Sequence, residues 1–259
     1  MNVLDLLWWL GWAWLAAWAA LPLLLLPWLG PVGGFVAWAV LAPWSALVGM
    51  AGMHRLLPRS EPGRFRLFAD PGAVRWALKG WAPSAYLAVF QPVFFMSEGF
   101  QRLVLRAFGA RLGAGALVTS RTVIREPHHV QIGAASLVGE FVHLAPAYQP
   151  RPKLLVVGDI VIGDEVLIGA HSVLAPGACV GHRSILEHAV SIGAHVVIGD
   201  DVHIGGGSTL YTGVCVGDRA VIGKACVIPA GTVIPAGALI PDGSVLPAPR
   251  AGQRERSSA

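Results

Sequence analysis

Residues 162–173 read IGDEVLIGAHSV, two successive six-residue units that each begin with Ile-Gly. An aliphatic residue returns at every sixth position from Ile162 to Ile240 without a slip. The fifth residue of each unit is Val, Ser, Ala, Cys or Thr throughout. A fixed period of this kind is the signature of a repeat architecture, in which each unit contacts its neighbours. Residues 162–240 therefore form one repeat array.

The six-residue period matches neither an α-helix nor a long strand. Each unit must be one short strand and one turn, with the recurring aliphatic residue pointing inward. Three units close a triangular coil of 18 residues, and stacked coils bury a continuous apolar column. The same column continues upstream, through Ile132, Val138 and Leu144 and, in an earlier phase, through Leu112, Val118, Ile124 and Val130. We predict an all-β parallel helix over residues 112–245.

Two irregularities interrupt this register. The phase shifts by two residues near Pro127-His128-His129. A second break falls at residues 145–155, where Pro146, Pro150 and Pro152 cannot all serve a regular strand. We expect the second segment to be a loop that leaves the prism.

The N-terminal segment predicts a membrane hairpin. No Asp, Glu, Lys or Arg occurs from Leu6 to Met53. This run suffices for two spans of about 20 residues, which we place at Leu6–Leu29 and Val32–Met53, hinged at Gly30-Pro31. The prolines also permit a re-entrant hairpin that enters one leaflet. Residues 1–54 are thus expected to be an α-helical transmembrane hairpin.

The charge distribution predicts on which side of the membrane the β-helix lies. Residues 55–125 contain eleven Lys and Arg against three acids, and positive flanks remain in the cytoplasm. The β-helix is therefore expected on the cytoplasmic side of a bacterial-type inner membrane, close to anionic lipid. The net charge of +4 needs no nucleic acid to explain it.

The remaining segments are assigned by composition. Residues 55–111 are expected to be a basic linker with interfacial helices, at Ala85–Ser97 and Gly99–Phe108. A core helix packed on the end of the β-helix is the alternative for the first of these. Residues 246–259, rich in Ala, Arg, Ser and Pro, are expected to be a disordered tail.

The repeat resembles the hexapeptide-repeat acyltransferase superfamily, on the units Ile162-Gly163-Asp164-Glu165-Val166 and Ile168-Gly169-Ala170-His171-Ser172. Parallel crossovers are right-handed in about 98% of cases, so a left-handed coil is implied by this resemblance alone. The resemblance also implies acyl transfer from acyl-CoA or an acyl-carrier protein to a hydroxyl or amine, with a histidine base. It further implies a homotrimer with active sites between prisms and no metal.

A finer resemblance covers roughly residues 63–245. Leu103 to Gly113, and Arg125-Glu126-Pro127 leading to Val130-Gln131-Ile132-Gly133, are similar to a membrane-associated branch that includes terminal domains of some non-ribosomal peptide synthetases. Because the hairpin and the interfacial segment keep the β-helix near lipid, we separately predict a membrane-bound or amphiphilic acceptor, such as a lipid-linked sugar or aminolipid.

His143 is the first candidate for the base. A base of near-neutral pKa suits proton removal from the acceptor. His143 comes one residue before the inward Leu144, so it should face outward beside the proline-rich segment. The resembling family also has a histidine close to this point. Glu140 is the candidate to orient the imidazole, although a solvated acid fits its turn position equally well.

The rival is His188 beside Glu187, a pair that resembles the Glu-His of bacterial sugar-amine acyltransferases; the Asp-Cys that often follows is Ala-Val here. For the donor, Gly205, Gly206 and Gly207 leave room for a pantetheine arm, and Lys224 offers a charge to a phosphate. A structural turn is the role that fits each of these residues better.

Two other functions fit the same fold. A non-catalytic scaffold is one alternative, and it requires that none of the histidines has a role in the function. A metalloenzyme similar to the gamma-class carbonic anhydrases requires two histidines five residues apart, whereas the gaps after His171 are 11, 6, 7 and 8.

Overall fold

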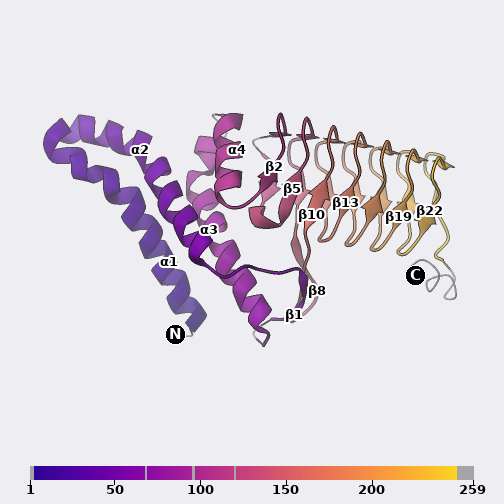
Figure 1. Ribbon diagram of the computed structural model, residues 1–259, viewed down its shortest axis with the longest axis horizontal. Helices are drawn as coiled ribbons and strands as arrows, with labels where there is room; N and C mark the ends of the chain where they lie inside the picture. The colour runs from indigo at the N-terminus through magenta and orange to yellow at the C-terminus, as the bar shows by residue number, and fades with distance from the viewer. Residues whose placement is uncertain (1–2, 68, 95–96, 120, 250–259) are drawn as a thin grey trace.

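A computed structural model describes residues 3–67, 69–94, 97–119 and 121–249. It consists of an N-terminal group of helices and a long parallel β-solenoid, which lie side by side along the longest axis of the molecule (Figure 1). This arrangement confirms the predicted class, a hexapeptide-repeat β-helix preceded by an apolar helical segment. The left-handed sense of the coils stays a prediction.

Three parallel sheets form the faces of the solenoid. The first contains β2 (Arg111–Leu112), β5 (Val130–Ile132), β10 (Ile160–Ile162), β13 (Cys179–Val180), β16 (Val197–Ile198), β19 (Cys215–Val216) and β22 (Val233–Ile234). The second contains β3 (Leu117–Val118), β6 (Leu137–Val138), β11 (Leu167–Ile168), β14 (Ile185–Leu186), β17 (His203–Ile204), β20 (Val221–Ile222) and β23 (Leu239–Ile240). The third contains β4 (Val123–Ile124), β7 (His143–Leu144), β12 (Val173–Leu174), β15 (Ser191–Ile192), β18 (Thr209–Leu210) and β21 (Val227–Ile228).

The 18-residue coil sets the pairing register. Leu167 pairs with Ile185, which pairs in turn with His203. The second residue of each two-residue strand points inward, and nearly all of these aliphatic side chains are buried in one core. The small fifth residue is also buried: Ser184 Oγ donates to the Gly199 carbonyl at 2.9 Å and accepts from the Val202 N–H at 3.0 Å. The fifth residue of the unit therefore lies inside the corner of the coil, where a small side chain fits.

Both predicted breaks in the register are present in the structure. Leu112 pairs with Ile132, two residues more than a full coil, because the short 3₁₀ helix η2 (Pro127–His129) is inserted. Leu137 pairs with Leu167, twelve residues more than a coil. The extra residues are not the expected loop but a hairpin, β8 (Ala147–Arg151) and β9 (Leu154–Val157), with a register shift between Tyr148 and Arg151.

This hairpin also ties the solenoid to the helices. Strand β1 (Gly63–Arg66) pairs antiparallel with β9, so a segment preceding the repeats completes the sheet. The prediction of a loop was wrong because Pro150 is tolerated on β8, an edge strand of this small sheet. Phe65, Leu155 and Val157 share a small core on one face of the sheet.

The apolar N-terminus forms α1 (Val3–Ala20), the 3₁₀ helix η1 (Leu21–Leu25) and α2 (Leu26–Leu56). The first helix ends nine residues earlier than predicted, because the 3₁₀ segment that follows Ala20 contains Pro22. Gly30 breaks the second helix with φ 66° and ψ 175°, which agrees with the predicted hinge. The stretch Trp9–Leu56 is long and apolar enough to cross a membrane, a property that core helices and signal sequences share.

Helices α1 and α2 pack closely where the last turn of α1 meets the second half of α2. A Cβ on Gly49 would lie 2.2 Å from Cγ of Trp18, so glycine admits the indole there. Ser45 Oγ donates to the Trp18 carbonyl at 2.8 Å. Beyond this contact, Trp28 and Phe35 are exposed. The tip of the helix pair therefore presents apolar side chains that the chain itself does not cover.

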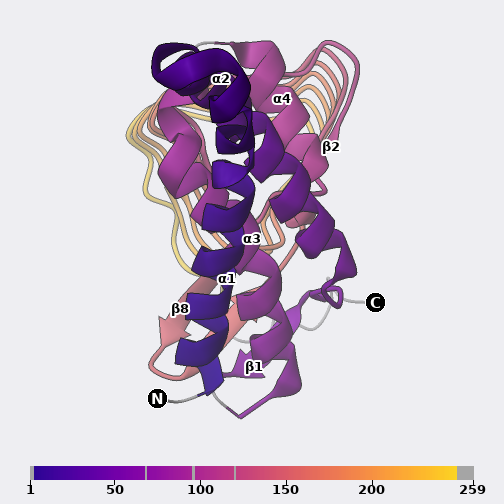
Figure 2. The ribbon, with the colours of Figure 1, turned by 90° about the vertical axis from the view of Figure 1, so that its left-hand side faces the viewer.

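Two further helices join this pair to the solenoid. Helix α3 (Pro71–Phe94) is longer than the expected interfacial helix, whose last residues fall outside the described part of the chain. Its Ala85 and Tyr86 are buried against α1 and α2, so it is a core helix. Helix α4 (Glu98–Ala107) confirms the second expected helix and places Leu105 in the solenoid core. In Figure 2 the helices cover the first end of the solenoid.

Candidate active site

His143 faces outward from the third sheet at the first coils of the solenoid. It pairs with Val123 on one side and Val173 on the other, and Leu144 beside it points into the core. The imidazole is half-buried. The outward orientation predicted for this residue is therefore present, directly before the β8–β9 hairpin.

The surroundings of His143 favour the neutral imidazole. Partial burial, followed by the Arg125 guanidinium, lowers the pKa of His143 below its ordinary value of 6.5. Arg125 directly follows β4, whose Val123 pairs with His143, and it is close enough for its charge to act on the imidazole. A neutral imidazole can accept a proton, which is the state that a general base needs.

Glu140 is exposed at the turn before β7. Its backbone carbonyl accepts from the His171 N–H at 3.0 Å. Within the described residues, no hydrogen bond joins its carboxylate to His143. The orienting role of Glu140 stays a prediction without a supporting contact.

A second group of polar residues gathers at the corner between the second and third sheets. Glu187, Gly205 and Gly223 stack one coil apart, as do His188, Gly206 and Lys224. Glu187 accepts from the Gly206 N–H at 2.9 Å and contacts His203 Nε2 at 3.1 Å. These two contacts, with the nearby Lys224, hold the pKa of Glu187 below its ordinary value.

This corner unites the rival pair with the predicted donor residues. His188 is exposed, and its ring lies over Gly206, where an added Cβ would be 2.7 Å from Cε1. His203 is the member that the sequence reasoning missed. The 18-residue period could have revealed this contact. It places His203 beside Ile185 on the next coil, and Glu187 follows Ile185 by only two residues.

His143 and the Glu187 corner are separate sites. His143 belongs to the third sheet, near the helices, whereas His203 belongs to the second sheet three coils further along. A single monomer therefore does not combine the two histidines in one catalytic group. Among the described residues, no three His, Cys, Asp or Glu side chains converge as a metal site would require.

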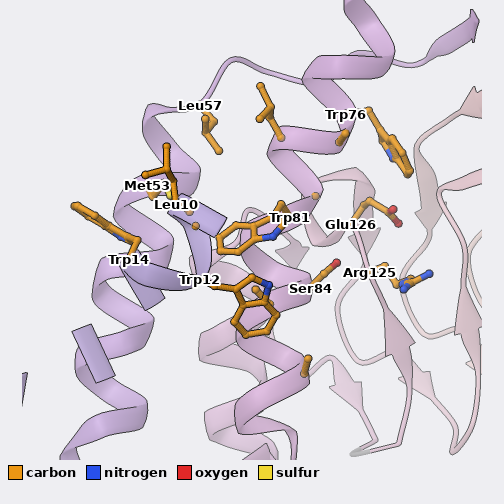
Figure 3. A pocket seen from close by; sticks show the side chains of 16 residues that line it. Leu10, Trp12, Trp14, Met53, Leu57, Trp76, Trp81, Ser84, Arg125 and Glu126 are labelled. Atoms are coloured by element: carbon orange, nitrogen blue, oxygen red, sulfur yellow. The ribbon is translucent and has the colours of Figure 1, made fainter. Parts of the chain in front are cut away.

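A cavity of about 780 Å³ lies between the helices and the first coil (Figure 3). Its walls are largely apolar, and Arg125 and Glu126 form the side that faces the solenoid. Burial raises the pKa of Glu126 to about 7, against the opposing effects of Arg125 and the Trp76 indole. Sequence reasoning used Arg125-Glu126 only as part of a resemblance and did not anticipate the cavity.

Comparisons with known proteins agree with the repeat. A family model described as the hexapeptide repeat of succinyl-transferase matches residues 159–194 and 195–236. No curated protein matches the chain. The repeats from residue 159 to residue 236 therefore belong to the hexapeptide type.

Solved structures with similarity to the chain have low scores. A hexapeptide transferase family protein from Anaplasma phagocytophilum is 14% identical, with a TM-score of 0.43, over 57% of this chain and 89% of that one. An N-acyltransferase from Bacillus cereus, solved with dTDP and 3-hydroxybutyryl-CoA, is 15% identical, with a TM-score of 0.43, over 51% and 80%. A hexapeptide-repeat acetyltransferase from Vibrio cholerae is 20% identical, with a TM-score of 0.40, over 63% and 87%.

Proposed function

Because this chain is a hexapeptide-repeat protein whose coils match the repeat of succinyl-transferase, we propose that it is an acyltransferase. It moves an acyl group, with acetyl as the first choice, from acyl-CoA or an acyl-carrier protein to a hydroxyl or amine. The observation that supports this proposal most directly is the match of the family model to residues 159–236.

His143 is proposed as the general base. Its neutral imidazole takes the proton of the acceptor O–H or N–H while the acceptor atom attacks the thioester carbonyl carbon. The C–S bond of the tetrahedral intermediate then breaks, and the leaving thiolate recovers that proton from the imidazolium. The half-buried position and the neighbouring Arg125 support this assignment, because both keep the imidazole neutral near pH 7.

The donor site is proposed at the Glu187 corner. Gly205 and Gly206 leave the corner without side chains, and the Lys224 ammonium offers a charge to a donor phosphate. The His188–Glu187 pair is the alternative base, supported by the position of the His188 ring over Gly206. In the proposed homotrimer the active sites lie between neighbouring prisms. The donor corner and the His143 of one active site therefore need not belong to the same copy.

The acceptor is proposed to be membrane-bound or amphiphilic. The exposed apolar tip of α1 and α2, which includes Trp28 and Phe35, supports insertion into a bilayer. The excess of basic residues over 55–125 supports a cytoplasmic location for the solenoid. The protein would thus act at the inner face of a bacterial-type inner membrane.

The test compares His143→Ala with His188→Ala in the full-length protein. Thiol release from acetyl-CoA is measured with bacterial membrane lipids as acceptor. Loss of a general base costs about 10²–10⁴-fold in rate, so we expect this loss in His143→Ala and a small effect in His188→Ala. The wild-type rate should also fall at acid pH, in a range displaced below 6.5, because the pKa of His143 is lowered by burial and by Arg125.

Three other outcomes would change the proposal. Unchanged activity of His143→Ala excludes it as the base, and a large loss only in His188→Ala assigns the role to the rival. Absence of transfer by the wild type with acetyl-CoA, longer acyl-CoA and acyl-carrier donors would favour a non-catalytic scaffold.

A further inference from the structure

We propose that the cavity between the helices and the first coil binds the hydrocarbon chain of the acceptor, an alkyl or polyprenyl phosphate that carries a head group with the accepting hydroxyl or amine and whose phosphate lies at Arg125. The inference rests on the proposed acyl transfer and specifies its acceptor. At about 780 Å³ the cavity lies within the range of roughly 300–1,000 Å³ that small-molecule sites occupy.

The walls of the cavity suit a flexible apolar chain. Trp12 of α1 and Trp81 of α3 meet edge to face, with ring centroids 6.1 Å apart. Gly11 permits this contact, because a Cβ there would lie 2.4 Å from the Trp81 ring. Leu10 and Met53 complete the side away from the solenoid (Figure 3). These surfaces offer apolar contact over most of the cavity.

Polar groups are concentrated at the opposite side. Arg125 and Glu126 lie there, on the segment that joins β4 to η2 (Figure 3). The Arg125 guanidinium is exposed and fits the planar, bidentate recognition of a phosphate. Arg125 is also near His143, since its charge lowers the pKa of that imidazole and Val123, two residues before it, pairs with His143. The residues therefore follow the order of a lipid phosphate: chain in the cavity, phosphate at Arg125, and acceptor hydroxyl or amine at His143.

We assign the bound hydrocarbon chain to a membrane lipid rather than to the acyl donor. Leu10 and Trp14, which line the cavity, are also exposed on α1. The cavity thus opens beside exposed apolar side chains of α1, and a lipid can enter sideways, without crossing water, from a bilayer that contacts this helix. A coenzyme A thioester has its large polar part in water, and the proposed donor corner lies on the solenoid away from this opening.

Photo-crosslinking of the full-length protein in detergent tests the binding site. The probe is hexadecyl phosphate with a diazirine in its chain, and labelled peptides are identified by mass spectrometry. We expect labelling of the α1 and α3 segments that line the cavity. Ser84→Trp places an indole in the cavity and should reduce this labelling at least tenfold. Val89→Trp, at an exposed position of the same helix outside the cavity lining, should leave it unchanged.

A second variant tests the phosphate contact. Arg125→Gln should weaken binding of hexadecyl phosphate about tenfold, as loss of one charge-assisted contact predicts, but should leave hexadecanol binding unchanged. Equal labelling of Ser84→Trp and Val89→Trp would overturn the cavity site, and an equal effect of Arg125→Gln on both probes would overturn the phosphate contact. Both assays contain no acyl donor, so their result is independent of whether acyl transfer occurs.

Discussion

At the residue scale, Glu126 shows how burial changes the chemistry of a side chain. The residue is 7% exposed and contacts the cavity, so its neutral form is favoured in the folded protein. The same physical cause acts on His143, where burial also favours the neutral form but lowers the pKa, since the charged form is the protonated one. Burial thus raises the pKa of the Glu126 carboxyl and lowers the pKa of the His143 imidazole, and each shift favours the uncharged form.

The pH dependence of stability should reveal Glu126. Its pKa is about 7 when folded and has an ordinary value of 4.5, so between these values the folded state holds more protons than the unfolded state. Stability should therefore fall as pH rises through this window, by at most roughly 3 kcal/mol. Glu126→Gln, which resembles the neutral acid, should remove that decline.

The measurement is the melting temperature of both proteins in detergent from pH 4.5 to pH 8. Wild type and Glu126→Gln should agree at the acid end, with the variant more stable at pH 8. Glu140→Gln, at an exposed carboxylate, serves as the control and should keep the wild-type decline. A parallel decline in Glu126→Gln would show that other groups cause it.

At the element scale, the solenoid corner depends on how closely consecutive coils approach. Gly205 is an example, because a Cβ there would lie 2.6 Å from the Gly223 carbonyl carbon and the Lys224 nitrogen. Both are backbone atoms that cannot move aside without disturbing the next coil. Gly213, with φ +71°, has no atom within 4 Å of its added Cβ, so only its backbone conformation favours glycine.

Alanine substitution should separate these two reasons for glycine. Gly205→Ala should cost about 3 kcal/mol or more through overpacking, whereas Gly213→Ala should cost about 1 kcal/mol through the left-handed backbone. Urea unfolding followed by circular dichroism gives both values. Equal costs would indicate that the coils relax apart, and the assignment of Gly205 to close coil contact would be wrong.

At the scale of the whole molecule, one end of a rigid solenoid carries an apolar helical group. The solenoid axis and the helix pair run in different directions, and α3 and α4 lie between them (Figures 1 and 2). The exposed apolar tip therefore points away from the coils. Such an arrangement holds the first two coils, with His143 and the cavity, on the side of the proposed membrane anchor.

Membrane attachment should require the apolar tip. Trp28 is 85% exposed and Phe35 is 64% exposed, and a charged side chain within the bilayer costs about 3 kcal/mol. Replacing both with Glu should lower liposome partitioning about a thousandfold or more. Flotation of the purified protein with liposomes measures this.

The matched control replaces Val233 and Leu239 with Glu, since both are exposed apolar residues on the distant coils. These changes should leave flotation intact. Loss of flotation in the control, or its retention in the tip variant, would contradict attachment through the helix pair.

The sequence by itself determined the solenoid, its 18-residue register and both breaks in that register, because one inward aliphatic residue per short strand leaves little freedom in pairing. It also located the hinge at Gly30 and the outward orientation of His143. Tertiary structure decided the rest. The sheet formed by β1, β8 and β9, the contact between Glu187 and His203, and the cavity at Glu126 each join residues from different segments or coils. Their meeting depends on packing between elements, which no local pattern of residues records.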